Sequence, residues 1–161
     1  MNGLKVSPAG LALIKRFESF SANPYRCPAG KLTIGYGHVI SMMDRLIPPI
    51  TVAQADALLA ADLSWVEEDL NALPLPLTQG QFDALASLTY NIGRGAFAGS
   101  TLKKRLLAHD MSGAADQFPR WVRANGKMRL GLVNRRIEEM RMFRAAPPSD
   151  PGIHQPTEAT P

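Results

Sequence analysis

The segment from Thr51 to Asn71 is the feature that most restricts the fold of this 161-residue chain. Thr51 and Gln54 form the capping-box pattern that opens a helix, and no glycine or proline interrupts the residues up to Asn71. This pattern predicts one helix of about 20 residues. Because a β-branched, glycine-containing stretch precedes it and further helical patterns follow it, we expect two lobes joined by this helix.

The remaining patterns predict an α+β fold with a cleft between the lobes. Ser7 and Pro8 open an N-terminal helix, and residues 31–40 alternate as in a strand or hairpin. Between them, the prolines and the glycine of "SANPYRCPAG" predict a turn. The later helices are expected after the Thr78–Gln81 capping box up to about Asn91, in 99–110, in 113–118 and in 131–143.

The length predicts one folded domain, 1–146, with a small lobe at about 12–60 and a helical lobe at about 73–144. Residues 147–161 are rich in proline and almost without large apolar side chains, so we expect a disordered tail. No apolar run approaches the roughly 20 residues that span a bilayer, and the N-terminus does not resemble a secretory signal. With a single cysteine, the sequence therefore predicts a protein made in a cytoplasm and not inserted in the membrane.

Positive charge is concentrated in the second half of the chain. Residues 1–72 hold 6 Lys or Arg against 7 Asp or Glu, whereas residues 73–144 hold 12 against 5. A basic lobe of net charge +7 is typical of proteins that approach an extended polyanion such as nucleic acid, anionic lipid or an acidic wall polymer, although it also serves solubility. The chain lacks interleaved aromatic and basic residues, which ranks nucleic acid last among these partners.

Candidate chemistry is concentrated between Glu18 and His38. Glu18 ends the first helix beside aromatic residues, and a partly apolar environment favours the protonated carboxyl that a general acid needs. Cys27 reads as a small buried hydrophobe, as a nucleophile paired with His38, or as a polar group in a glycosidase site. Thr33 and Tyr36 also fit ordinary strand packing. His38 could be a catalytic base, but a histidine at a strand end more often makes a structural hydrogen bond. None of these residues identifies a function singly.

Taken together, their spacing resembles a known active site. Glu18, eight residues, Cys27, five residues and Thr33, followed by "IGYGH", is similar to the signature of the phage-type lysozymes, the endolysin muramidases of glycoside hydrolase family 24. The likeness continues through residues 84–106, which resemble the cleft helix of that family, and through 131–143, which resemble its closing helix. The resemblance implies a lysozyme-like fold and hydrolysis of the β-1,4 bond between N-acetylmuramic acid and N-acetylglucosamine.

The resemblance also implies a role for each matched residue. Glu18 matches the general acid, Thr33 a hydroxyl that places the attacking water, and Cys27 a position where many members carry Asp. The substrate-binding positions of the family correspond to Tyr36, Gly37, Tyr90 and Asn91. The resemblance also implies that His38, paired with Asp62, supports the site, as does Arg135 beside the catalytic Glu. No metal or cofactor is implied.

The resemblance therefore implies an inverting muramidase that acts as a monomer on peptidoglycan after a separate holin releases it. Two alternatives remain open: a cell-wall cysteine peptidase or amidase that uses Cys27, and a non-catalytic glycan-binding module.

Overall fold

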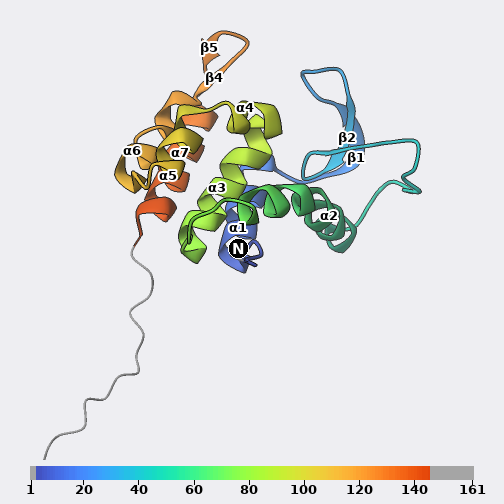
Figure 1. The fold of residues 1–161 in the computed structure, drawn as a ribbon. Coiled ribbons are helices and arrows are strands. Elements are labelled where there is room, and N and C mark those ends of the chain that lie inside the picture. The colour runs from blue at the N-terminus through green and yellow to red at the C-terminus, as the bar shows by residue number, and fades with distance from the viewer. Residues whose placement is uncertain (1–2, 146–161) are drawn as a thin grey trace, which may run out of the picture.

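A computed structural model describes residues 3–145, and the tail expected at 147–161 lies outside them. The α+β expectation is confirmed: helices form most of the structure and a small antiparallel sheet projects from one side (Figure 1). The elements, in chain order, are α1 (Pro8–Glu18), β1 (Ser21–Arg26), β2 (Leu32–Gly35), β3 (His38–Val39), α2 (Val52–Asn71), α3 (Gln79–Ile92), α4 (Arg94–Ala98), α5 (Thr101–Leu107), α6 (Met111–Ala115), the 3₁₀ helix η1 (Phe118–Arg120), β4 (Arg123–Ala124), β5 (Lys127–Met128) and α7 (Leu130–Arg144).

The three-stranded sheet has the order β1-β2-β3 and forms the small lobe. The sequence predicted a turn across "SANPYR", which was wrong because these six residues form β1. The register between β1 and β2 shifts between Ser21 and Tyr25, so Pro24 falls in an irregularity where the ladder does not need its missing N–H. The turn itself is confined to the residues after Arg26.

Two capping boxes determine where the central helices begin. Thr51 and Gln54 cap α2 reciprocally, and Thr78 and Gln81 do the same for α3. α2 runs to Asn71, as predicted, and passes beneath the sheet toward the helical lobe (Figure 1). α3 ends at Ile92, one residue beyond the expected end.

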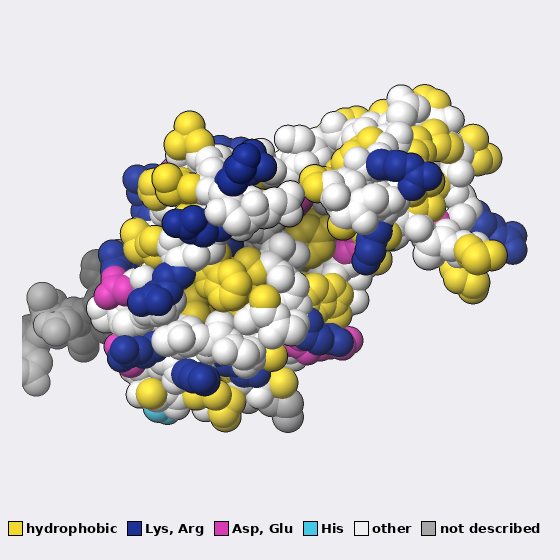
Figure 2. All heavy atoms as spheres, turned by 90° about the horizontal axis from the view of Figure 1, so that it is seen from above, with side chains coloured by type: hydrophobic (Ala, Val, Ile, Leu, Met, Phe, Trp, Pro, Cys, Tyr) yellow, Lys and Arg dark blue, Asp and Glu magenta, His cyan; other side chains and the backbone are white. Residues whose placement is uncertain are grey.

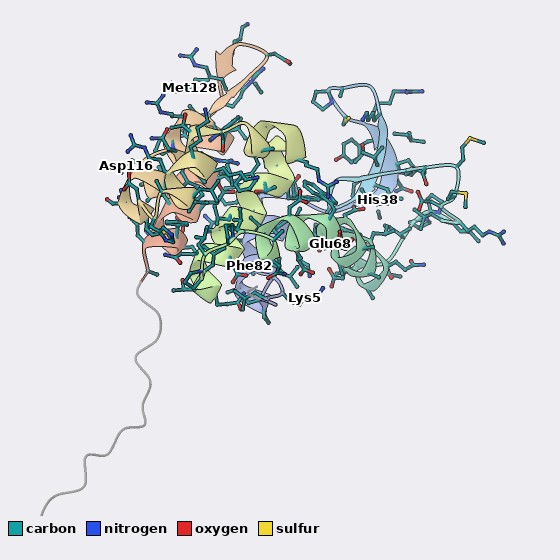
Figure 3. The ribbon with its side chains drawn as sticks, viewed as in Figure 1. Lys5, His38, Glu68, Phe82, Asp116 and Met128 are labelled. Carbon is teal, nitrogen blue, oxygen red and sulfur yellow. The ribbon has the colours of Figure 1, made fainter. Side chains whose placement is uncertain are left out.

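The hydrophobic core lies around α3. Every residue from Phe82 to Thr89 is buried, and the helix packs between α1, α2 and α7. Figure 3 shows Phe82 among these helices, and its side chain is fully buried. Burying apolar surface stabilises a core by roughly 25 cal/mol per Å². A helix surrounded in this way is a rigid support for side chains at its C-terminal end, Tyr90 and Asn91.

The helical lobe carries a hairpin that the sequence prediction missed. β4 and β5 pair across Asn125 and Gly126, whose φ angles are 52° and 73°. Asn-Gly is a strong signal for such a two-residue turn, because both residues tolerate positive φ. Met128 lies in this hairpin, which projects from the rest of the lobe (Figure 3).

The two lobes differ in surface charge. Lys and Arg side chains gather over the side of the molecule that carries α5, α6 and α7 (Figure 2). This agrees with the charge asymmetry of the sequence. No helix within residues 3–145 is long and apolar enough to cross a membrane.

Candidate active site

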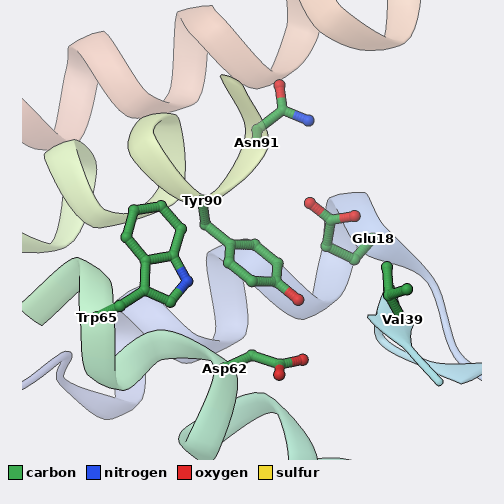
Figure 4. A pocket seen from close by; sticks show the side chains of 7 residues that line it. Glu18, Val39, Asp62, Trp65, Tyr90 and Asn91 are labelled. Atoms are coloured by element: carbon green, nitrogen blue, oxygen red, sulfur yellow. The ribbon is translucent and has the colours of Figure 1, made fainter. Parts of the chain in front are cut away.

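A cavity of about 320 Å³ lies where the small lobe meets α2 and α3. Its lining residues are Glu18, Gly37, Val39, Asp62, Trp65, Tyr90 and Asn91, and Figure 4 shows six of these side chains around it. Five of them belong to the residues that the sequence prediction singled out: Glu18, Gly37, Asp62, Tyr90 and Asn91. Segments far apart in the chain therefore converge on one polar hollow.

Glu18 is the acidic group at the edge of this cavity. It is the last residue of α1, and the chain turns away directly after it because Ser19 adopts a φ of 61°. Arg135 of α7 donates from Nη1 to Glu18 Oε1 across 2.5 Å. The other oxygen, Oε2, faces Gly37, where an added Cβ would lie only 3.4 Å from it. One carboxyl oxygen is thus held by a cation and the other is turned toward the hairpin and the cavity.

Arg135 is itself fixed by a buried network. Its Nε donates to Glu139 Oε1 across 3.1 Å, and its Nη2 donates to the Ser87 carbonyl oxygen across 3.1 Å. Ser87 donates from its hydroxyl to the same Glu139 oxygen across 2.6 Å. Glu139 is fully buried, and its burial raises the pKa of the carboxyl against the pull of two neighbouring arginines. The network gives the guanidinium beside Glu18 one defined orientation.

Arg136, the neighbour of Arg135 on α7, orients Asn91. Arg136 donates from Nη2 to Asn91 Oδ1 across 2.6 Å. Burial lowers the pKa of Arg136 to about 10, so the side chain stays charged at neutral pH. With its oxygen engaged in this way, Asn91 can donate from its amide nitrogen, which has no acceptor within residues 3–145, into the cavity on the side where Figure 4 shows Glu18.

Tyr90 joins the two lobes at the centre of the cavity. Its hydroxyl donates to the Tyr36 carbonyl oxygen across 3.2 Å. Burial raises the pKa of the Tyr90 phenol, with further contributions from the charges of Asp62 and Glu18, so it stays protonated. The Tyr36 side chain is buried and packs against Phe20 at 5.7 Å between ring centroids. Tyr36 therefore reaches the site through its backbone, whereas the sequence analysis predicted direct substrate binding.

His38 links β3 to α2. Its Nδ1 lies 3.0 Å from Asp62 Oδ2, and its Nε2 lies 3.2 Å from Asp44 Oδ2. Burial lowers the pKa of His38, but hydrogen bonds and charges from Asp62 and Asp44 outweigh it and raise the pKa overall. Burial raises the pKa of Asp62, although His38 opposes the shift. Both imidazole nitrogens are thus occupied by carboxylates in a structural bridge.

Cys27 and Thr33, which were predicted as catalytic, are not among the residues that line the cavity. Thr33 lies on β2 opposite Tyr25, is buried, and donates from its hydroxyl to the Lys31 carbonyl oxygen across 3.1 Å. Burial raises the pKa of Cys27, but backbone N–H groups of Lys31 and Ala29 and the Thr33 hydroxyl together lower it. Burial raises the pKa of the Tyr25 phenol, and the charges of Glu18 and Cys27 add to this shift.

Several residues of the site were not predicted from the sequence. Trp65 and Val39 line the cavity, while Ser87, Arg136 and Glu139 support it from below. Trp65 follows Asp62 by three positions on a helix, so the two share a face, and the prediction for Asp62 contained a signal for Trp65. Over residues 3–145 the structure brings together no group of three or more His, Cys, Asp or Glu side chains that would hold a metal ion.

The chain is similar in sequence to known proteins. The phage lysozyme family matches residues 15–139. The endolysin of Acyrthosiphon pisum secondary endosymbiont phage 1 is 43% identical over 148 residues, which cover 89% of this chain and all of that protein. The endolysin of Salmonella phage P22 is 38% identical, covering 87% of this chain and 98% of that protein.

Solved structures show the same fold. The muramidase domain of SpmX from Asticaccaulis excentricus superimposes with a TM-score of 0.80 at 37% identity, covering 88% of this chain and 99% of that one. An endolysin from Escherichia coli O157:H7 phage FAHEc1 superimposes with a TM-score of 0.79 at 36% identity, covering 89% and 95%.

Proposed function

The chain belongs to the phage lysozyme family, and from that premise we propose how its residues hydrolyse peptidoglycan. Its activity is that of a lytic endolysin, a muramidase glycoside hydrolase. The bond cleaved is the β-1,4 linkage between N-acetylmuramic acid and N-acetylglucosamine. The single observation that carries the residue assignment is the cavity in which Glu18 lies, facing Gly37 and held by Arg135.

Glu18 acts as the general acid that protonates the leaving glycosidic oxygen. Arg135 holds Oε1, so the proton that is transferred resides on Oε2, the oxygen turned toward Gly37. Proton transfer requires the two oxygens to approach within about 2.6–3.2 Å. Gly37 allows this approach because it has no side chain to fill the space in front of Oε2.

Thr33 and Cys27 place the attacking water. The Thr33 hydroxyl has one proton, which it donates either to the Lys31 carbonyl oxygen or to Cys27 Sγ, and in both cases its oxygen can accept a hydrogen bond from water. The lowered pKa of Cys27 favours the thiolate, which accepts a water proton better than the thiol does. Water then forms a bond to the anomeric carbon as the glycosidic C–O bond breaks; the leaving oxygen takes the Glu18 proton, and the Cys27 thiolate accepts the proton that the water loses.

This arrangement favours inversion at the anomeric carbon. A retaining site needs a second carboxylate roughly 5–5.5 Å from the acid to form the covalent intermediate. The other carboxylate of the cavity lining, Asp62, is committed to its bridge with His38. A single displacement by water agrees with these contacts.

The cysteine peptidase or amidase alternative has weaker support. It requires His38 as the base for Cys27, but Asp62 and Asp44 engage both ring nitrogens of that histidine.

Tyr90 and Asn91 fit glycan binding: Asn91 presents amide donors for acetamido and hydroxyl groups, and Tyr90 supplies part of the apolar wall.

We further propose that the enzyme acts as a monomer, is made in the host cytoplasm, and reaches the wall after a separate holin opens the membrane.

Product analysis tests the proposal. Purified peptidoglycan is digested, and the soluble fragments are reduced and identified by mass spectrometry. Muramidase action predicts new reducing ends on N-acetylmuramic acid with intact stem peptides. New N-terminal amines without new reducing ends would show a peptidase or amidase, and wall binding without any new ends would show a binding module.

A further inference from the structure

Trp65 is a cavity residue to which the proposed mechanism gives no role. It lies on α2, is half-buried, and lines the same hollow as Glu18 and Tyr90. Figure 4 shows Tyr90 between Trp65 and Glu18, with the indole nitrogen on the side of the ring toward Tyr90. A half-buried tryptophan combines a large apolar body with one polar N–H group, which buried indoles normally pair with an acceptor.

The indole N–H of Trp65 has no acceptor within the described part of the chain. The residue is a cavity wall, so this donor is available to a molecule that enters. Among the other polar groups of the lining, Tyr90 donates to Tyr36 and Asp62 pairs with His38, whereas the Asn91 amide is the second donor that faces the cavity. Trp65 thus supplies an unused donor beside an apolar surface.

One face of the ring has a cationic neighbour. The guanidinium of Arg94 lies over the indole, with Cζ 5.0 Å from the ring centroid. Arg94 donates from Nε to Asp69 Oδ2 across 2.7 Å, and Asp69 lies one turn beyond Trp65 on α2. An aromatic side chain that already packs against a neighbour loses less conformational entropy when a ligand binds.

We propose that Trp65 is a specificity-determining residue that binds an N-acetylated hexosamine unit of the glycan strand. The apolar ring surface contacts the C–H groups of the sugar, and Nε1–H donates to the carbonyl oxygen of its acetamido group. Trp65 is displaced from Glu18 across Tyr90, so the unit it binds is not the one that receives the proton. This inference rests on the proposed function for its substrate class.

Tryptophan fluorescence reports on this contact directly. The chain has two tryptophans, so Trp121→Phe leaves Trp65 as the single emitter. This change is combined with Glu18→Gln to prevent cleavage, and the protein is titrated with the N-acetylglucosamine tetramer. We expect a saturable change in Trp65 emission with the same Kd that calorimetry gives. Cellotetraose, which lacks acetamido groups, is expected to give no saturable change.

Substitutions at position 65 measure the size of the contact. In the Glu18→Gln protein, Trp65→Leu is expected to weaken tetramer binding about tenfold, which corresponds to about 1.4 kcal/mol. Trp65→Phe keeps an aromatic ring but loses the N–H, so we expect a weakening of about threefold. With Glu18 intact, both variants are expected to raise KM for soluble glycan while kcat stays within about twofold.

Several outcomes would overturn the inference. These are an absence of tetramer binding, calorimetric binding without a Trp65 response, equal binding of cellotetraose, or a Kd within twofold of the parent for Trp65→Leu. If Trp65→Leu does not fold, the inference is tested by the emission titration and by the tetramer affinity of Trp65→Phe. If the wild type hydrolyses the wall but Trp65 emission does not change with the tetramer, this inference is wrong and the proposed function stands. If Trp65 emission changes but the wild type does not hydrolyse the wall, the proposed function is wrong and the contact at Trp65 stands.

Discussion

Replacing Gly37 by alanine places a methyl group directly in front of the proposed acid. The added Cβ would lie 3.4 Å from Glu18 Oε2 and 3.7 Å from the Tyr90 hydroxyl oxygen. A leaving oxygen must come within about 2.6–3.2 Å of the acid oxygen to accept its proton, so methyl group and substrate compete for one space. A misplacement of roughly 1 Å costs about 100-fold in rate, and we expect kcat/KM to fall by at least that factor.

The same substitution has a separate effect on stability. Gly37 has a φ of 91°, a conformation that L-residues rarely adopt. Holding a non-glycine residue there costs about 1–3 kcal/mol. For a chain of this size each kcal/mol lowers Tm by about 2–4 °C, so the expected loss is about 2–12 °C.

Gly35→Ala is the matched control. Gly35 also has positive φ, 65°, and an added Cβ would lie 3.2 Å from Ala55 Cβ, away from Glu18. We expect it to lower Tm at least as much as Gly37→Ala while keeping activity within a few-fold of wild type at a temperature where both are folded. Circular dichroism melts and initial rates on soluble glycan supply the two readouts. Wild-type kcat/KM in Gly37→Ala would refute the position given to the scissile bond.

Three further predictions concern other parts of the molecule. Cys27→Asp is expected to keep substantial activity and Cys27→Ala to lose more, because a carboxylate still accepts a hydrogen bond from water; equal inactivity of two folded variants in initial-rate assays would remove Cys27 from the site. Lysis of whole walls is expected to fall as salt rises past about 0.1 M, where the Debye length is about 10 Å, while cleavage of a neutral oligosaccharide changes little; equal salt sensitivity would exclude attraction by the basic lobe. The raised pKa of His38 means that its bridge to Asp62 and Asp44 stabilises the fold at pH below about 6.5 and that this gain is lost as pH rises through the folded-state pKa. His38→Gln should therefore lower Tm by roughly 2–4 °C at pH 5.5 and by less at pH 8.5, and an equal or larger loss at pH 8.5 would contradict this bridge.

Local sequence patterns were sufficient for the main helices. Capping boxes at Thr51 and Thr78 mark the starts of α2 and α3, because each cap is made by residues three positions apart. The β1 strand was missed because Pro24 suggests a turn, and only the pairing with β2 shows that the irregularity accommodates it. The β4–β5 hairpin had a local signal in Asn125–Gly126 that the prediction did not use.

The supporting residues of the site were harder to predict for a physical reason. Ser87 and Glu139 meet across 52 positions of the chain, and nothing local to either indicates the other. The aromatic wall formed by Trp65 depends equally on the placement of α2 against Tyr90. Family resemblance located the residues that match a motif, and with them the supports His38, Asp62 and Arg135. The buried partners Ser87, Arg136 and Glu139 became visible only through tertiary contacts.

Glu18→Gln tests the central claim most directly. The amide keeps the shape of the side chain but has no proton to transfer to the leaving oxygen. Release of reducing ends from purified peptidoglycan is measured for wild type and variant, together with wall binding and the thermal melt. We expect hydrolysis to fall at least 1,000-fold, within the range that general acid catalysis supplies, while binding and folding persist. Hydrolysis within a few-fold of wild type by a folded Glu18→Gln protein would contradict the assignment of Glu18 as the catalytic acid.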